Sequence, residues 1–237
     1  MVTTTVRKAG FERRFYLTAS VGFAALVAWT FARTYYLKAI FHTPELSWLI
    51  HVHGIAMTGW VVLLALQSAL IASGRVRLHR RIGVFGAGWA AFVVVLGSVT
   101  TLHAGAREVH AGSAAAAGQL VIMGLDLLQM LLFGIYVTLA IAWRRRPDVH
   151  KRLMLLTIAC MLPDALARLP GDFMTNFMIL VGINLFVVAS VAVDTVRHRR
   201  LHPAFGWGAG AFVVLFNLAL PAMQTHSWIA FATWLVR

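Results

Sequence analysis

Hydrophobic residues in this chain gather in long runs, and the polar residues gather in the short stretches between them. Most runs approach the roughly 20 residues that a helix needs to cross the hydrocarbon core of a bilayer. We therefore predict seven transmembrane helices, at approximately residues 15–37, 47–73, 82–103, 116–143, 152–167, 173–194 and 205–225. The predicted fold class is an all-α polytopic transmembrane helix bundle, with residues 1–237 forming a single integral membrane domain.

Two stretches depart from the pattern of a plain membrane helix. The fifth run is short and ends around Pro163 and Pro170, where we expect a break or tilt because proline removes a backbone hydrogen-bond donor. The stretch 227–237 is apolar and carries Trp228 and Trp234. We expect this tail to lie in the membrane interface, where tryptophan is enriched.

The composition excludes a water-soluble enzyme. Hydrophobic residues make up 60% of the 237 positions and charged residues only 12%, whereas a soluble domain is about half apolar and about a quarter charged. A formal net charge of +13 would suggest nucleic acid as the partner of a soluble chain. Here the basic residues follow the membrane spans, so the expected partner is the lipid bilayer and no nucleic acid.

Basic residues mark alternate connections between the predicted helices. They are Arg7, Lys8, Arg13 and Arg14 at the start, then Arg75, Arg77, Arg80 and Arg81, then Arg144, Arg145, Arg146, Lys151 and Arg152, and finally Arg197, Arg199 and Arg200. Cytoplasmic loops of membrane proteins carry an excess of lysine and arginine. The pattern predicts a cytoplasmic N-terminus and a C-terminus outside, and it supports the count of seven spans, since a missed helix would break the alternation.

Carboxylates are scarce, and only Asp126 is predicted to lie deep in the membrane, about 15 Å into a core of about 30 Å. An unpaired charge there is costly, so Asp126 is protonated or paired, with Gln129 close by on the same helix. Three roles are open for Asp126: a proton relay, a group that tunes a metal or haem ligand, and a hydrogen-bonding group that joins helices. Asp164 and Arg168 are one helical turn apart, and we predict an ion pair between them.

Ten histidines are many for this length, and they divide into two groups by predicted depth. His51, His53, His103 and His110 form the outer group. His51 and His53 are two residues apart, about 200° of rotation on a helix, so they face different ways. The face of His53 is predicted to look inward through Met57, Trp60, Leu64 and Gln67. His53 is a packing histidine, a metal or haem ligand (with His51 as a second candidate metal ligand), or a proton-transfer group.

His79 and His150 form the inner group, at the starts of two predicted helices. Two histidines on neighbouring helices can ligate a haem iron from both sides, and Arg80 and Arg81 could then pair with the haem propionates. The alternative is that these histidines bind phospholipid headgroups. His198 and His202 have a spacing that suits a metal on a helix, but we expect no acid or third ligand beside them.

Three segments carry a resemblance to a known family: HVHGIAMTGWVVLLALQ (51–67), RVRLHRRIG (75–83) and RPDVHKRLMLL (146–156). They resemble an uncharacterised family of bacterial polytopic membrane proteins with H-[RK]-R-[LI] segments, some relatives of which are linked to cytochrome oxidase assembly. The layout is also loosely similar to the two-haem transmembrane cytochromes b. The resemblance implies a bacterial inner membrane location and a haem between His79 and His150. The fourth helix has no histidine, so His53 has only His103 as a partner.

These observations lead to one main hypothesis. The chain is an inner-membrane redox or haem/metal-handling protein, and so a possible membrane oxidoreductase, that binds haem b or copper, with zinc as a further possibility. Its partner is a quinone or a subunit of a respiratory complex. The alternatives are a cofactor-free transporter or assembly subunit that uses Asp126, and a membrane metallohydrolase that uses His51, His53, His103 and Asp126.

Overall fold

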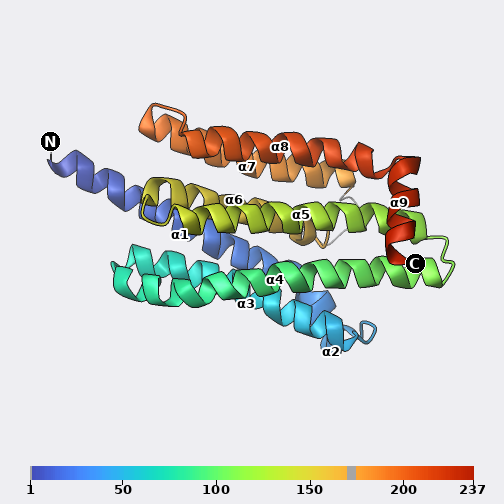
Figure 1. The fold of residues 1–237 in the computed structure, drawn as a ribbon. Helices are drawn as coiled ribbons and strands as arrows, with labels where there is room; N and C mark the ends of the chain where they lie inside the picture. The colour runs from blue at the N-terminus through green and yellow to red at the C-terminus, as the bar shows by residue number, and fades with distance from the viewer. Residues whose placement is uncertain (1, 170–174) are drawn as a thin grey trace.

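The computed structural model describes residues 2–169 and 175–237, and every regular element in this part of the chain is a helix (Figure 1). The elements are α1 (Val2–Thr30), the π-helix η1 (Ala32–Tyr36), α2 (Lys38–Phe41), α3 (Trp48–Ala72), α4 (Val76–His110), α5 (Ala116–Ala142), α6 (Pro147–Leu166), α7 (Asn176–His198), α8 (Pro203–Met223) and α9 (His226–Val236). The predicted all-α class is confirmed. Six of the predicted spans overlap one helix each, and the first, 15–37, covers the second half of α1 and the π-helix η1.

The outer faces of the bundle are apolar. Among the described residues, five helices are long and apolar enough to cross a membrane: α3, α4, α5, α7 and α8. Large apolar side chains such as Val84, Leu185 and Trp207 are exposed on them, and a surface of this kind is stable against lipid rather than water. The chain is therefore a multi-pass membrane protein. Helices α1 and α6 are not among the five, so the count of seven spans and the orientation stay predictions.

Helix α6 lies inside the bundle, packed against α1, α5, α7 and α8. Nearly every side chain from Arg152 to Pro163 is buried. The helix continues through Pro163 to Leu166, so the predicted break at Pro163 is wrong. The proline lies in the last turn, where it removes a single backbone hydrogen bond and the surrounding helices hold the turn in place. Pro170 lies outside the described residues.

The N-terminal part of α1 and the connections α3–α4, α5–α6 and α7–α8 lie at one end of the bundle, on the left in Figure 1. We call this the basic end, because these connections contain the basic segments of the sequence. At the opposite end, α9 lies across the bundle. The indole Nε1 of Trp228 donates a hydrogen bond to the carbonyl of Leu120 at 3.0 Å, which holds α9 against α5. A place for this tail in the membrane interface stays a prediction.

Asn184 on α7 and Asn217 on α8 hold these two helices together. Each side-chain amide donates to the other's side-chain oxygen, at 3.1 and 3.0 Å. Such polar pairs join helices where lipid offers no competing partner.

Candidate functional site

Two cavities lie along the axis of the bundle, and the same five helices, α1, α3, α4, α5 and α6, contribute to both. The first, nearer the basic end, holds about 450 Å³ and is lined by both His79 and His150. The second holds about 260 Å³ and is lined by Asp126. We call them the His79–His150 cavity and the Asp126 cavity.

A buried aromatic pair lies between the two cavities. Trp60 on α3 and Phe133 on α5 meet edge to face with ring centroids 4.9 Å apart. On α5, Phe133 comes between Met130, which lines the Asp126 cavity, and Val137, which lines the other. The two cavities are therefore separate sites rather than one channel.

His79 and His150 are neighbours in the first cavity. They come from α4 and α6, and their ring centroids are 6.2 Å apart with the rings nearly perpendicular. A metal atom bonded to one nitrogen of each ring at about 2.0–2.1 Å would hold the centroids roughly this far apart. The sequence predicted two histidines on neighbouring helices, and the fold brings them together.

Hydrogen bonds fix the orientation of both rings. Nδ1 of His150 donates to the carbonyl of Ala140 at 2.9 Å, which leaves Nε2 without a proton in the neutral ring. Metal-ligating histidines commonly donate their other nitrogen to a carbonyl in this way. The amide of Gln67 lies against Nδ1 of His79 at 2.5 Å, with its oxygen accepting from the backbone N–H of Gly83. Gln67, a predicted site residue, therefore positions His79.

The cavity wall is apolar in its middle and charged at one end. Trp60, Leu64 and Ile158 are among the apolar lining residues. The cationic side chains that line it are Arg13 and Lys151, rather than Arg80 and Arg81, which are exposed on α4. The partners that the sequence suggested for haem propionates are thus placed elsewhere, and two other cations are at hand.

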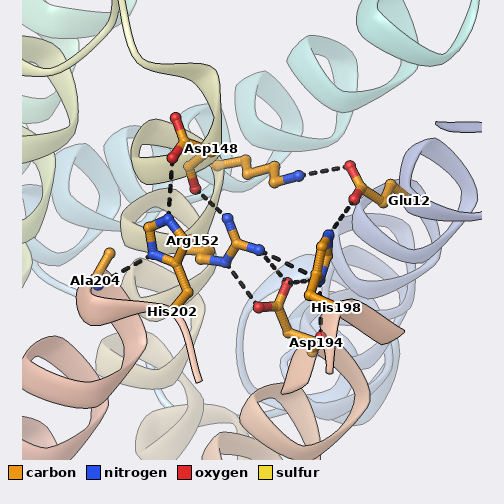
Figure 2. A network of polar contacts seen from close by, with 8 residues as sticks. Glu12, Asp148, Arg152, Asp194, His198, His202 and Ala204 are labelled. Atoms are coloured by element: carbon orange, nitrogen blue, oxygen red, sulfur yellow. Dashed lines mark hydrogen bonds and ion pairs between the residues drawn. The ribbon is translucent and has the colours of Figure 1, made fainter. Parts of the chain in front are cut away.

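A polar network closes the basic end of the bundle (Figure 2). Glu12 on α1 accepts from Lys151 Nζ on α6 at 2.5 Å and lies 2.7 Å from Nε2 of His198 on α7. Burial raises the pKa of Glu12, but the hydrogen bonds and charges of Lys151 and His198 outweigh it, so the pKa lies below its usual range. One carboxylate therefore connects three helices.

Arg152 and Asp194 form the buried centre of this network. The guanidinium is 2% exposed, and it donates from Nε and Nη2 to the two carboxylate oxygens at 2.9 and 2.7 Å. Its Nη1 donates to the backbone carbonyl of Asp148 at 2.6 Å. Bidentate arginine–carboxylate pairs of this kind are among the stronger hydrogen-bonded interactions in proteins.

His202 also has an acid beside it. Its Nε2 donates to Asp148 at 3.0 Å, and this bond holds the pKa of Asp148 below its usual range. Its Nδ1 accepts from the backbone N–H of Ala204 and caps α8. The expectation that no acid accompanies His198 and His202 is therefore wrong. Glu12 comes from α1 and Asp148 from α6, which sequence spacing does not connect to the two histidines, while Asp194 lies on α7 with His198.

The sequence reasoning missed Glu12, Asp148, Asp194 and the burial of Arg152. A signal was present: these three acids are among only eight in the chain, and each lies within a basic segment or beside one. Asp194 also lies one helical turn before His198, the spacing at which side chains on a helix meet.

The Asp126 cavity gathers residues that the sequence singled out separately. His53, Asp126, Gln129, Asp164 and Arg168 all line it. They come from α3, α5 and the end of α6, and η1 adds Tyr35 and Tyr36. The predicted inward face of α3 is confirmed, since His53 and Met57 line this cavity while Trp60, Leu64 and Gln67 line the other.

Hydrogen bonds hold the carboxylate of Asp126. It accepts from the hydroxyl of Thr101 at 2.9 Å and from Nε2 of Gln129 at 3.2 Å. The predicted ion pair between Asp164 and Arg168 is present, with Nη1 and Oδ1 3.7 Å apart. The Arg168 guanidinium also lies over the ring of Phe31, 4.4 Å from its centroid.

The other outer histidines lie outside this cavity. His103 is exposed on α4. His51 faces the ring of Tyr35, with centroids 6.0 Å apart, and its carbonyl accepts from the Tyr35 hydroxyl at 3.0 Å. Within residues 2–169 and 175–237, no three His, Cys, Asp or Glu side chains form a group that could hold a metal ion. His51, His53 and His103 stay predicted ligands that the fold does not gather.

Comparison with protein-family models, with curated proteins and with solved structures finds no match for this chain.

Proposed function

We propose that this chain is a membrane redox protein that holds a haem, or a single copper ion, between His79 and His150. The observation that carries the proposal is the pair itself. Two imidazoles from different helices lie 6.2 Å apart, centroid to centroid, in the wall of a largely apolar cavity. Imidazole on both sides of an iron is a common haem ligation in membrane cytochromes.

The other residues of the cavity fit a haem. His150 donates Nδ1–H to a backbone carbonyl, which leaves Nε2 as the ligand atom. The apolar wall around Leu64 and Ile158 suits the macrocycle. Arg13 offers positive charge for a carboxylate at the rim, whereas Lys151 is already paired with Glu12. When bound, the haem would supply one-electron chemistry, while the chain excludes water and fixes the ring orientations.

Gln67 is a positioning residue in this proposal. Its amide nitrogen donates to Nδ1 of His79 in the orientation that also satisfies Gly83, so the neutral ring carries its proton on Nε2. For Nε2 to bind iron, that proton would move to Nδ1 and the Gln67 amide would turn its oxygen toward it. Changing Gln67 would alter the orientation of His79 without removing a ligand.

The proposal includes a topology and a partner. The chain would cross the bacterial inner membrane seven times, with the basic end in the cytoplasm, as the excess of arginine there supports. A quinone or a subunit of a respiratory complex would exchange electrons with the site.

A visible absorption spectrum, with iron, copper and zinc analysis of the same sample, tests the proposal. Protein purified from cells supplied with a haem precursor should show a Soret band. His79→Ala and His150→Ala should each lose or shift the band, and His79→Met should keep a haem at a higher reduction potential.

His226→Ala is the matched control, because His226 is exposed at the opposite end of the bundle and the spectrum should not change. Helix content by circular dichroism shows whether each variant has folded. Wild-type protein that is colourless and free of iron and copper would overturn the proposal, as would a band that survives both alanine variants.

A further inference from the structure

The Asp126 cavity lies beyond the Trp60–Phe133 pair and has no part in the proposed haem site, so its occupant can be argued independently. Two residues that line the cavity carry buried polar atoms without partners. Gln129 is 3% exposed, and its Oε1 has no hydrogen-bond partner although its Nε2 donates to Asp126. Nδ1 of His53 is also buried without a partner. Buried polar atoms in native proteins are normally satisfied, so these atoms point to a ligand.

The free atoms are mainly acceptors. An amide oxygen only accepts, a carboxylate only accepts when ionised, and a neutral imidazole presents one acceptor nitrogen. Asp126 uses one hydrogen bond on each of its two oxygens and retains capacity for more. A ligand that completes this site therefore has to bring several donors.

The charges of the cavity favour a cation. Asp126 and Asp164 both line it, and of the described residues around it only Arg168 carries a fixed positive charge. Arg168 is already engaged, since it pairs with Asp164 and lies over the ring of Phe31. A positive ligand group would balance an ionised Asp126, whose hydrogen-bond partners Thr101 and Gln129 are both neutral.

The remaining wall is apolar and adaptable. Met57, Met130 and Met161 line the cavity together with Phe23. Thioethers fit irregular apolar groups, and aromatic faces attract cations. A cavity of about 150 Å³ is large enough for benzene, so the 260 Å³ here can accept a ring with a short polar arm.

From these four features we propose that the Asp126 cavity binds a small organic ligand with a protonated primary amine. The ammonium group has three donors. The Asp126 carboxylate would accept from one of them, and the side chains of Gln129 and His53 would turn their unpartnered Oε1 and Nδ1 toward the others, because both atoms are closed off from the cavity in this structure. The hydrocarbon part of the ligand packs against the methionines. Tyr35 and Tyr36 of η1 cover the site at the end of the bundle away from the basic segments, where Tyr36 shares a hydrogen bond of 2.8 Å with Thr58.

Calorimetric titration of the purified full chain tests this proposal with three probes of one size. Benzylammonium chloride should bind at one site, while benzyl alcohol and sodium benzoate should bind about tenfold more weakly or not at all, because charge-assisted hydrogen bonds are worth about 1.5–3 kcal/mol each. Asp126→Asn and Gln129→Met should each weaken benzylammonium by about tenfold or more.

Matched controls separate loss of the site from loss of the fold. Glu108→Gln changes an acid in the last turn of α4, outside both cavities, and Gln119→Met makes the same change as Gln129→Met two to three turns earlier on α5, also outside both. Both should bind benzylammonium like the wild type. If Asp126→Asn does not fold, Gln129→Met decides, because it keeps both carboxylates.

Several results would overturn the proposal. Equal binding of benzyl alcohol and benzylammonium would show that the site is an apolar cavity without a preference for a cation. Undiminished binding of benzylammonium to Gln129→Met would show that Gln129 is not part of the site. Binding of zinc chloride but not of benzylammonium, or no binding of any probe, would also contradict the proposal. None of these outcomes bears on the Soret band, so the two proposals fail independently.

Discussion

Arg152 shows how one residue can differ from its appearance in the sequence. In the basic segment 144–152 it looks like a solvated charge, yet it is among the largest fully buried side chains, held by Asp194 and by the carbonyl of Asp148. Removing one partner of such a pair leaves a buried charge without compensation, which is more costly than removing both.

Asp194→Ala should therefore lower the free energy of unfolding by about 3–5 kcal/mol. The double variant Asp194→Leu with Arg152→Met should recover most of that loss, because no buried charge remains. Glu45→Ala is the control: it breaks an ion pair with Lys38 in which the Glu45 side chain is 95% exposed, and should cost less than about 1 kcal/mol. Unfolding in mixed micelles measures all three, and equal losses for the single and double variants would contradict this interpretation.

At the scale of elements, the helices were predictable and their mutual contacts were not. The boundaries of α3 and α5 follow from the lengths of apolar runs, a local property. The π-helix η1, the extension of α4 to His110 and the crossing of α9 over the bundle end depend on what packs against them. Tyr35 of η1, for example, lies where a methyl group on residue 54 would stand, so its position needs Gly54.

Glu12 provides a test at this scale, because its carboxylate connects α1 to α6 and α7. Its pKa is lower in the folded protein than in the unfolded chain, where it is 4.5. The ionised carboxylate therefore stabilises the fold at pH values above 4.5, and this stabilisation is lost as the pH falls through the pKa of the folded protein. Glu12→Gln should reduce stability by about 1–3 kcal/mol at pH 7, and the difference from wild type should vanish as the pH is lowered below 4.5.

Melting temperatures of both proteins between pH 7 and pH 3 measure this effect. Glu108→Gln is the matched control at the opposite end of the bundle, and its profile should follow the wild type near pH 7. A constant difference between Glu12→Gln and wild type across the whole range would show that the carboxylate charge is not what connects these helices.

For the whole molecule, the sequence indicated the class and the environment but only part of the sites. Pairing of His79 with His150 could be predicted, because both begin helices on the same side of the bundle. The convergence of His53, Asp126 and Asp164 could not, since three helices must pack before their side chains share a cavity. Glu12 and His198 are 186 residues apart, and nothing local to either predicts their contact.

The predicted orientation of the whole molecule can be tested with one substitution at each end. Cys160, the single cysteine, is fully buried, so an added cysteine is labelled against little background. Ala114→Cys, in the α4–α5 connection, should react with a membrane-impermeant maleimide in intact spheroplasts. Ser73→Cys, at the basic end, should react only after permeabilisation. Labelling of Ser73→Cys in intact spheroplasts would show that the orientation is the opposite of the predicted one.

The buried contact between Arg152 and Asp194 also bears on how the chain is made. The two residues are 42 positions apart, so α6 leaves the ribosome before its counter-charge on α7 has been synthesised. An arginine at the centre of an isolated membrane helix costs about 2.5–3.5 kcal/mol on insertion. Arg152, in the second turn of α6, would bear part of that cost until Asp194 is present to pair with it. We therefore expect α6 and α7 to insert into the membrane together as a helical hairpin, with α6 staying near the translocation machinery until α7 has been synthesised.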